Sequence, residues 1–147
     1  MISAIDLSNY VISEANKLKK PLSNLKLQKI LYYIQGRYMA LNNEPMFPEE
    51  IEAWPYGPVV RDVYVKYVSC GALNLRPDPQ VSFPLFTDEE KSCVDSVLKD
   101  KIDCSASSLV KATHRERPWL DHVNEVNKGL KPVISKASIK EFFLESK

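Results

Sequence analysis

Apolar residues recur at every third or fourth position in two stretches near the start of the chain. The first runs from residue 5 to residue 18, and the second runs from residue 27 to residue 41. This spacing is typical of amphipathic helices. Pro21 ends the first stretch, and Ser23 or Asn24 can cap the second. The pattern predicts two helices joined by a short turn.

The second of these helices carries large side chains on more than one face. Besides the main apolar stripe, Tyr32, Gln35 and Met39 form a second face. We therefore expect this helix to be covered on more than one side. Gly36 lies in its middle, where glycine costs about 1 kcal/mol of helix stability relative to alanine. Such a glycine predicts the close approach of another backbone.

An aromatic and proline-rich segment follows. Residues 51–54 are predicted to be extended, because the residue before Pro55 avoids the helical region. Gly57 and Pro58 predict the start of a helix that continues to Tyr67, since proline is favoured at the first helical position.

The second half of the chain predicts shorter helices. Residues 72–86 contain three prolines and no helical period, which indicates a long surface connection. The polar run at 87–90 is a capping box that opens a helix ending near Asp100. Further helix starts are predicted at Ser105, at Pro118 after a break near Glu116, and at Ser135 or Ser138.

These elements predict a mainly α protein. We expect one compact helical bundle over residues 1–147, with a two-stranded β element near Ile51 and Val133. Hydrophobic residues make up 44% of the chain, which is enough for one core without disulfides.

The charge balance narrows the classes of partner. The formal net charge is only +1, whereas duplex DNA and anionic membranes both favour a strong basic excess. The amino-terminal segment lacks the basic region of a signal peptide, and no stretch approaches the roughly 18 apolar residues of a membrane span. We expect a cytoplasmic protein that binds no membrane and for which nucleic acid is a disfavoured partner.

Cofactor and metal chemistry find little support in the sequence. The three cysteines, Cys70, Cys93 and Cys104, lack a zinc-binding spacing and are expected to be reduced thiols. With only 4 glycines there is no glycine-rich phosphate loop. The acidic run at 49–52 is expected to be solvated rather than to bind a cation. The sequence predicts no cofactor and no metal.

His114 is the strongest single candidate for catalysis. Glu116 lies two residues away and could orient it as a general base, and His122 follows eight residues after His114. The order of these residues does not match the His-Glu-x-x-His pattern of a metalloenzyme helix. The favoured interpretation is a hydrogen-bonded histidine at a helix break. The alternative is a small hydrolase or transferase centred on His114.

Basic residues on the second helix raise a further alternative. Lys26, Lys29 and Arg37 lie along it, as expected for a nucleic-acid-binding accessory protein of phage origin. A helix-turn-helix protein would carry a clearer three-helix unit and more charge. The favoured interpretation is a solvated helix face.

Residues 51–64 read "IEAWPYGPVVRDVY" and concentrate rigid and aromatic side chains. Tryptophan and tyrosine are common both in cores and at protein interfaces. We expect Trp54 to anchor inside the protein, while Tyr56 and Arg61 face a partner.

Three blocks together resemble a known family. They are "LSNLKLQKILYYIQGRYMAL", "IEAWPYGPVVRDVYVKY" and "SLVKATHRERPW". In this order they resemble the Panacea domain family, also described as SocA-like or phage-associated GepA-like proteins. The resemblance runs from about Ile5 to Phe143.

The resemblance implies a role outside enzymology. Panacea-domain proteins are similar to antitoxins, which neutralise toxin proteins encoded beside them. One branch resembles a proteolytic adaptor that delivers its toxin to the ClpXP protease. The expected function is an antitoxin-like protein with a cognate toxin as partner and ClpXP as a candidate second partner.

The resemblance also divides the notable residues into two groups. Those expected to have structural roles in the family signature are Trp54, Gly57, Pro58, His114, Pro118 and Trp119. Gly57 is expected to adopt a backbone angle that other residues resist. The protein-binding candidates, chosen on chemistry alone, are Tyr56, Arg61, Tyr64, Lys26, Lys29, Tyr33 and Arg37. No residue is assigned a catalytic role.

Overall fold

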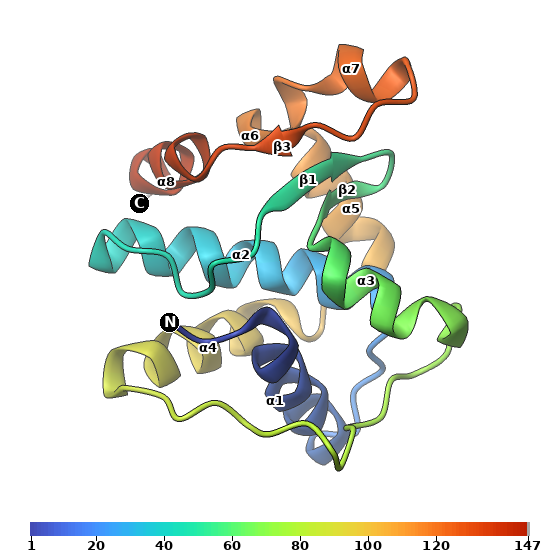
Figure 1. Ribbon diagram of the computed structural model, residues 1–147, viewed down its shortest axis with the longest axis vertical. Helices are drawn as coiled ribbons and strands as arrows, with labels where there is room; N and C mark the ends of the chain where they lie inside the picture. Colours follow the sequence, from blue (N-terminus) through green and yellow to red (C-terminus); the bar gives the residue numbers. More distant parts are fainter. Residues whose placement is uncertain (147) are drawn as a thin grey trace.

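A computed structural model describes residues 1–146 (Figure 1). It is mainly helical with one small sheet, as the sequence predicts. In chain order the described elements are α1 (Ala4–Lys17), α2 (Asn24–Asn42), β1 (Ile51–Trp54), β2 (Gly57–Val59), α3 (Arg61–Tyr67), the 3₁₀ helix η1 (Val68–Cys70), α4 (Asp88–Lys101), α5 (Ala106–His114), α6 (Arg117–Leu120), α7 (Val123–Asn127), β3 (Val133–Ile134) and α8 (Lys136–Glu145).

Helix α2 is the centre of the core. It crosses the middle of the molecule, with α1 and α4 on one side and α5, α8 and the sheet on the other (Figure 1). Its main stripe is buried as far as Tyr38, and its second face is also buried, including Tyr32 and Gln35, whereas Leu41 at the end of the stripe is exposed. The expectation that this helix is covered on more than one side is confirmed.

Helix starts follow the local capping chemistry. Ser23, Thr87, Ser105 and Ser135 each accept a hydrogen bond from the backbone N–H three residues later. Thr87 and Glu90 form the predicted reciprocal capping box. These helix starts are therefore confirmed at the predicted residues.

The sheet has three antiparallel strands in the order β2-β1-β3. The predicted pairing of the two distant segments is confirmed, because Ile51 pairs with Ile134. The prediction that Gly57 and Pro58 start a helix is wrong. Pro58 lies in β2, and α3 begins three residues later at Arg61. An edge strand tolerates proline because one side of the strand needs no N–H donor.

Gly36 on α2 lies against an aromatic side chain and not against another backbone. A Cβ atom built on Gly36 would lie 2.2 Å from two ring atoms of Phe143. The glycine thus admits an aromatic ring from α8, and the predicted approach of another backbone is wrong. No sequence-local pattern links position 36 to position 143.

The long segment before α4 has no helix, as predicted, but it is anchored. The Asn9 side chain donates to the Asp78 and Val81 carbonyls and accepts from the Asp78 N–H. Leu75 is buried, and its N–H donates to the Leu22 carbonyl at 2.8 Å. None of the helices in residues 1–146 combines the length and apolar composition needed to cross a membrane.

Candidate functional site

A buried lysine lies beneath the aromatic segment. Lys29 on α2 has no exposed surface, and its Nζ donates to the Pro58 carbonyl at 2.8 Å. Burial lowers the pKa of Lys29 to about 7. Its interpretation as part of a solvated, partner-facing helix surface is wrong, because α2 is enclosed on all sides at this level.

Gly57 packs directly over this lysine. Its φ is +112°, and an added Cβ atom would lie 2.7 Å from Lys29 Cε and 2.8 Å from Thr113 Oγ1. The prediction that Gly57 adopts an angle other residues resist is confirmed. The position also lacks room for a side chain, so β2 can lie close to α2 and α5.

Trp119 anchors the same region from α6. It is buried, and its Nε1 donates to the Trp54 carbonyl at 2.8 Å. Pro118 is buried beside it at the start of α6. The expectation that Trp54 anchors inside the protein is wrong, because the Trp54 ring is only half-buried while Trp119 fills the interior position.

His114, the last residue of α5, stacks on Trp119 with ring centroids 4.0 Å apart. Burial lowers the pKa of His114, against a smaller opposing effect of the Pro55 backbone. Its Nε2 is buried without a hydrogen-bond partner in residues 1–146.

The carboxylate of Glu116 is engaged elsewhere. Its two oxygens accept hydrogen bonds from the Tyr32 and Tyr33 hydroxyls at 2.9 Å and 2.8 Å. Burial raises the pKa of Glu116, and the two tyrosine hydrogen bonds oppose this. Within residues 1–146, His114 and Glu116 therefore do not form a hydrogen-bonded pair.

An aromatic cluster covers the outside of this buried layer. The Trp54 ring lies 4.7 Å from the Tyr64 ring, and the Arg61 guanidinium lies 5.2 Å from the Trp54 centroid. Lys131, just before β3, lies over the same ring, also at 5.2 Å. Tyr56 is 68% exposed. Three of the protein-binding candidates, Tyr56, Arg61 and Tyr64, are thus brought together.

A small groove adjoins this cluster. Its volume is about 280 Å³, and it is lined by Asn24, Leu25, Gln28, Trp54, Pro55, Tyr56, Val59, Tyr64, Val68 and Gly71. We define the signature surface as Trp54, Tyr56, Arg61, Tyr64, Val68 and Lys131.

The other candidates lie elsewhere. Lys26 is buried, and its Nζ donates to the Ile102 and Pro21 carbonyls, so its interpretation as a partner-facing residue is also wrong. Tyr33 and Arg37 line a second groove, of about 590 Å³. Arg37 is engaged there by Asp100 at 2.9 Å.

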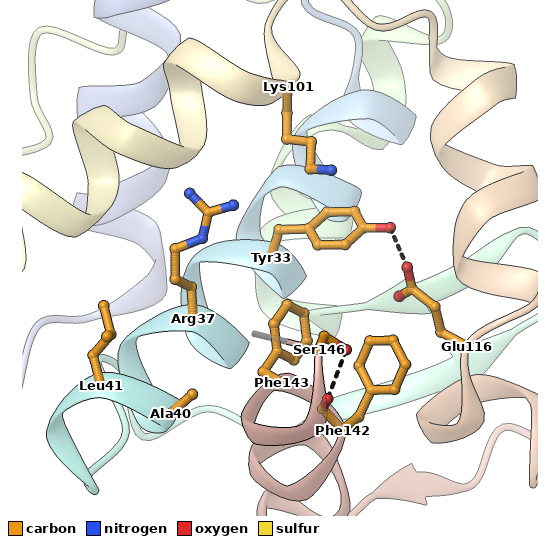
Figure 2. A pocket seen from close by; sticks show the side chains of 9 residues that line it. All are labelled: Tyr33, Arg37, Ala40, Leu41, Lys101, Glu116, Phe142, Phe143 and Ser146. Carbon is orange, nitrogen blue, oxygen red and sulfur yellow. Dashed lines mark hydrogen bonds between the residues drawn. The ribbon is translucent and has the colours of Figure 1, made fainter.

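Figure 2 shows this second groove between α2 and α8. Leu41 and Ala40 lie at one end, Glu116 lies at the other, and Phe142 and Phe143 face them from α8. The Lys101 Nζ lies 4.4 Å from the Tyr33 ring centroid. We call this the α2–α8 groove.

A family model described as "Antitoxin SocA-like, Panacea domain" matches residues 27–120. The chain belongs to this family. The match contains most of α2 together with β1, β2, α5 and α6, and these elements build the buried layer under the signature surface.

One relative extends this comparison. Over 63 residues the chain is 38% identical to "Antitoxin SocA" of Caulobacter vibrioides (strain NA1000 / CB15N). The aligned part is 43% of this chain and 34% of that protein, so the chain spans about a third of the relative's length. No solved structure matches the chain.

Sequence reasoning missed several residues of the site. Lys131 and Val68 lie 77 and 14 positions from Trp54 (131 − 54 and 68 − 54). Only the β1–β3 pairing and the fold of η1 bring them to it. The Tyr32–Tyr33–Glu116 hydrogen bonds likewise depend on how α2 packs against α5 and the helix break that follows it. The only early indication was that Tyr33 and Glu116 both fall in the family blocks.

Proposed function

We propose that this chain is an antitoxin that binds a cognate toxin protein directly through the signature surface and neutralises it by covering it. Membership of the Antitoxin SocA-like family supports the antitoxin role. The observation that favours this surface is a half-exposed aromatic cluster built on residues from all three family blocks.

The cluster is suited to binding because it is rigid before a partner arrives. Trp54 Nε1 donates to Glu52 at 2.9 Å, and Arg61 donates to both oxygens of the same carboxylate. Burial tends to raise the pKa of Glu52, but Arg61, Trp54 and Lys131 together lower it, so the carboxylate is charged at neutral pH. Aromatic side chains held in this way lose little entropy on binding.

A binding role is also supported by what surrounds His114. The ring is stacked on Trp119, and the nearest carboxylate in sequence, Glu116, is engaged by two tyrosines. A general base needs a substrate within hydrogen-bond reach of its nitrogen. These contacts favour a structural use of His114 over the hydrolase alternative.

The test is co-expression with the product of the neighbouring gene. We expect that product to arrest growth when expressed alone and the wild-type chain to restore growth. The double variant Tyr56→Ala, Val68→Glu changes exposed parts of the signature surface, so we expect a folded protein that no longer restores growth.

Two controls locate the site. Leu85→Glu changes a side chain that is 97% exposed and lies outside both grooves, so it should restore growth like the wild type. Leu41→Glu changes the α2–α8 groove. Loss of rescue with Leu41→Glu, together with full rescue by the double variant, would place the toxin site in that groove instead. A harmless neighbouring product would contradict the antitoxin role itself.

A further inference from the structure

Resting on this proposed function, we infer that the toxin presents to the signature surface one large apolar side chain next to an acidic residue. The apolar side chain enters the small groove between α2, the β1–β2 turn and η1. The carboxylate of the acidic residue lies between Lys131 and Arg61.

The floor of the groove favours an apolar occupant, because its polar groups already have partners. Asn24 Nδ2 donates to the Tyr64 carbonyl, and Asn24 Oδ1 accepts from Gln28 Nε2. Gln28 Oε1 accepts from the Val60 N–H at 2.8 Å. A polar side chain entering here would lose its hydrogen bonds to water and gain few in return.

The walls and the size of the groove agree with this occupant. Leu25, Pro55, Tyr64 and Val68 present carbon atoms to the space, and Val68 is 49% exposed. The volume of about 280 Å³ is at the lower limit of small-molecule pockets. It suits one large side chain rather than a cofactor.

The charges beside the groove favour an acidic neighbour. Three charged groups surround the Trp54 ring, namely Glu52, Arg61 and Lys131. Glu52 is neutralised by its two-point contact with Arg61. Lys131 makes no hydrogen bond and no ion pair with another residue of 1–146. The surplus positive charge over the Trp54 ring, which lines the groove, therefore complements a carboxylate.

The charge component is tested with the purified neighbouring gene product as the probe and the full chain as the binder. Lys131→Glu should raise the dissociation constant about tenfold or more. It should also make the dissociation constant depend less on salt concentration between about 50 mM and 500 mM. The matched control is Lys128→Glu, which makes the same charge change at an exposed position three residues away. It should change the dissociation constant less than about twofold.

The apolar component has its own matched pair. Val68→Thr keeps the shape of a groove-lining side chain and adds a hydroxyl, so binding should weaken about fivefold. Val65→Thr makes the same change on the exposed face of α3 outside the groove and should have little effect. The side chains changed in these four variants, at positions 65, 68, 128 and 131, are all exposed. Far-ultraviolet circular dichroism checks that each variant folds.

The outcomes separate this inference from the function on which it rests. Failure of the wild-type chain to bind the neighbouring product contradicts the proposed function. Tight binding that is insensitive to salt, to Lys131→Glu and to Val68→Thr would leave the antitoxin role intact and overturn the inferred chemistry of the toxin segment.

Discussion

At the residue scale, the site depends on side chains that no partner can reach. Lys29, Gly57, Thr113 and Trp119 form a buried layer, and Trp54 and Tyr64 lie on top of it. Most residues of the family blocks in this region therefore support the signature surface from below and are not themselves exposed. The exposed residues that would contact a toxin are few and lie between the supporting ones.

Gly57 gives the sharpest prediction for this layer. Gly57→Ala forces a side chain into a φ of +112° and places its Cβ against Lys29 and Thr113, so we expect a loss of about 3 kcal/mol in the free energy of unfolding. Gly71→Ala is the control, because its φ is +58° but the added Cβ meets open space. It should cost about 1 kcal/mol. Equal losses in urea denaturation would show that contact with the buried layer is unimportant.

Lys29 predicts a dependence of stability on pH. Its pKa is about 7 in the folded protein and near 10.5 when unfolded, so between these values the unfolded chain binds a proton that the folded chain does not. The contribution of Lys29 to the free energy of unfolding should therefore rise with pH in this range, by about 1.4 kcal/mol per pH unit. Lys29→Met should remove that slope between about pH 7.5 and pH 9.

The exposed Lys111→Met provides the control for this titration and should keep the wild-type slope. His114 also has a lowered pKa, but it changes charge below this window. Parallel curves of unfolding free energy against pH for wild type and Lys29→Met would mean that the buried amine stays charged.

At the element scale, the sequence predicted what local chemistry decides. Ser23, Thr87 and Ser105 start helices because each hydroxyl satisfies a nearby N–H, and that reason is visible in four consecutive residues. Pro58 was misjudged because the same residue suits a helix start and an edge strand. Only the pairing of β2 with β1 decides between them.

The burial of Lys26 and Lys29 also could not be predicted from the sequence. Lys26 and Lys29 look like a solvated stripe because lysine is rarely buried, and their environment depends on where α4, α5 and β2 pack against α2. By contrast, Tyr56 and Arg61 are exposed, as a partner-facing role requires, because the β1–β2 turn and the start of α3 lie at the surface.

The docking of α8 on α2 yields a prediction whose sign depends on the background. In the wild type, Gly36→Ala should destabilise the protein, because its Cβ would overlap the Phe143 ring. In a Phe143→Ala background the same change should stabilise it by up to about 1 kcal/mol, through helix propensity alone. A double-mutant cycle in thermal unfolding measures both. Destabilisation of the same size in both backgrounds would rule out the ring contact as the cause.

At the scale of the whole molecule, α2 separates two possible interaction regions. The signature surface lies over its first half, and the α2–α8 groove lies along its second half. In the groove, Arg37 is paired with Asp100, and Lys101 opposes Glu116 across Tyr33, so the charges balance. The signature surface carries the surplus positive charge of Lys131 beside its aromatic cluster, and we therefore propose it, rather than the groove, as the toxin-binding surface.

The most direct test of this account is amide hydrogen exchange of the chain with and without the neighbouring gene product. We predict slower exchange in the complex for residues 51–71 and around Lys131, with little change in α8. A bound complex in which residues 51–71 exchange as they do in the free chain would contradict the central claim.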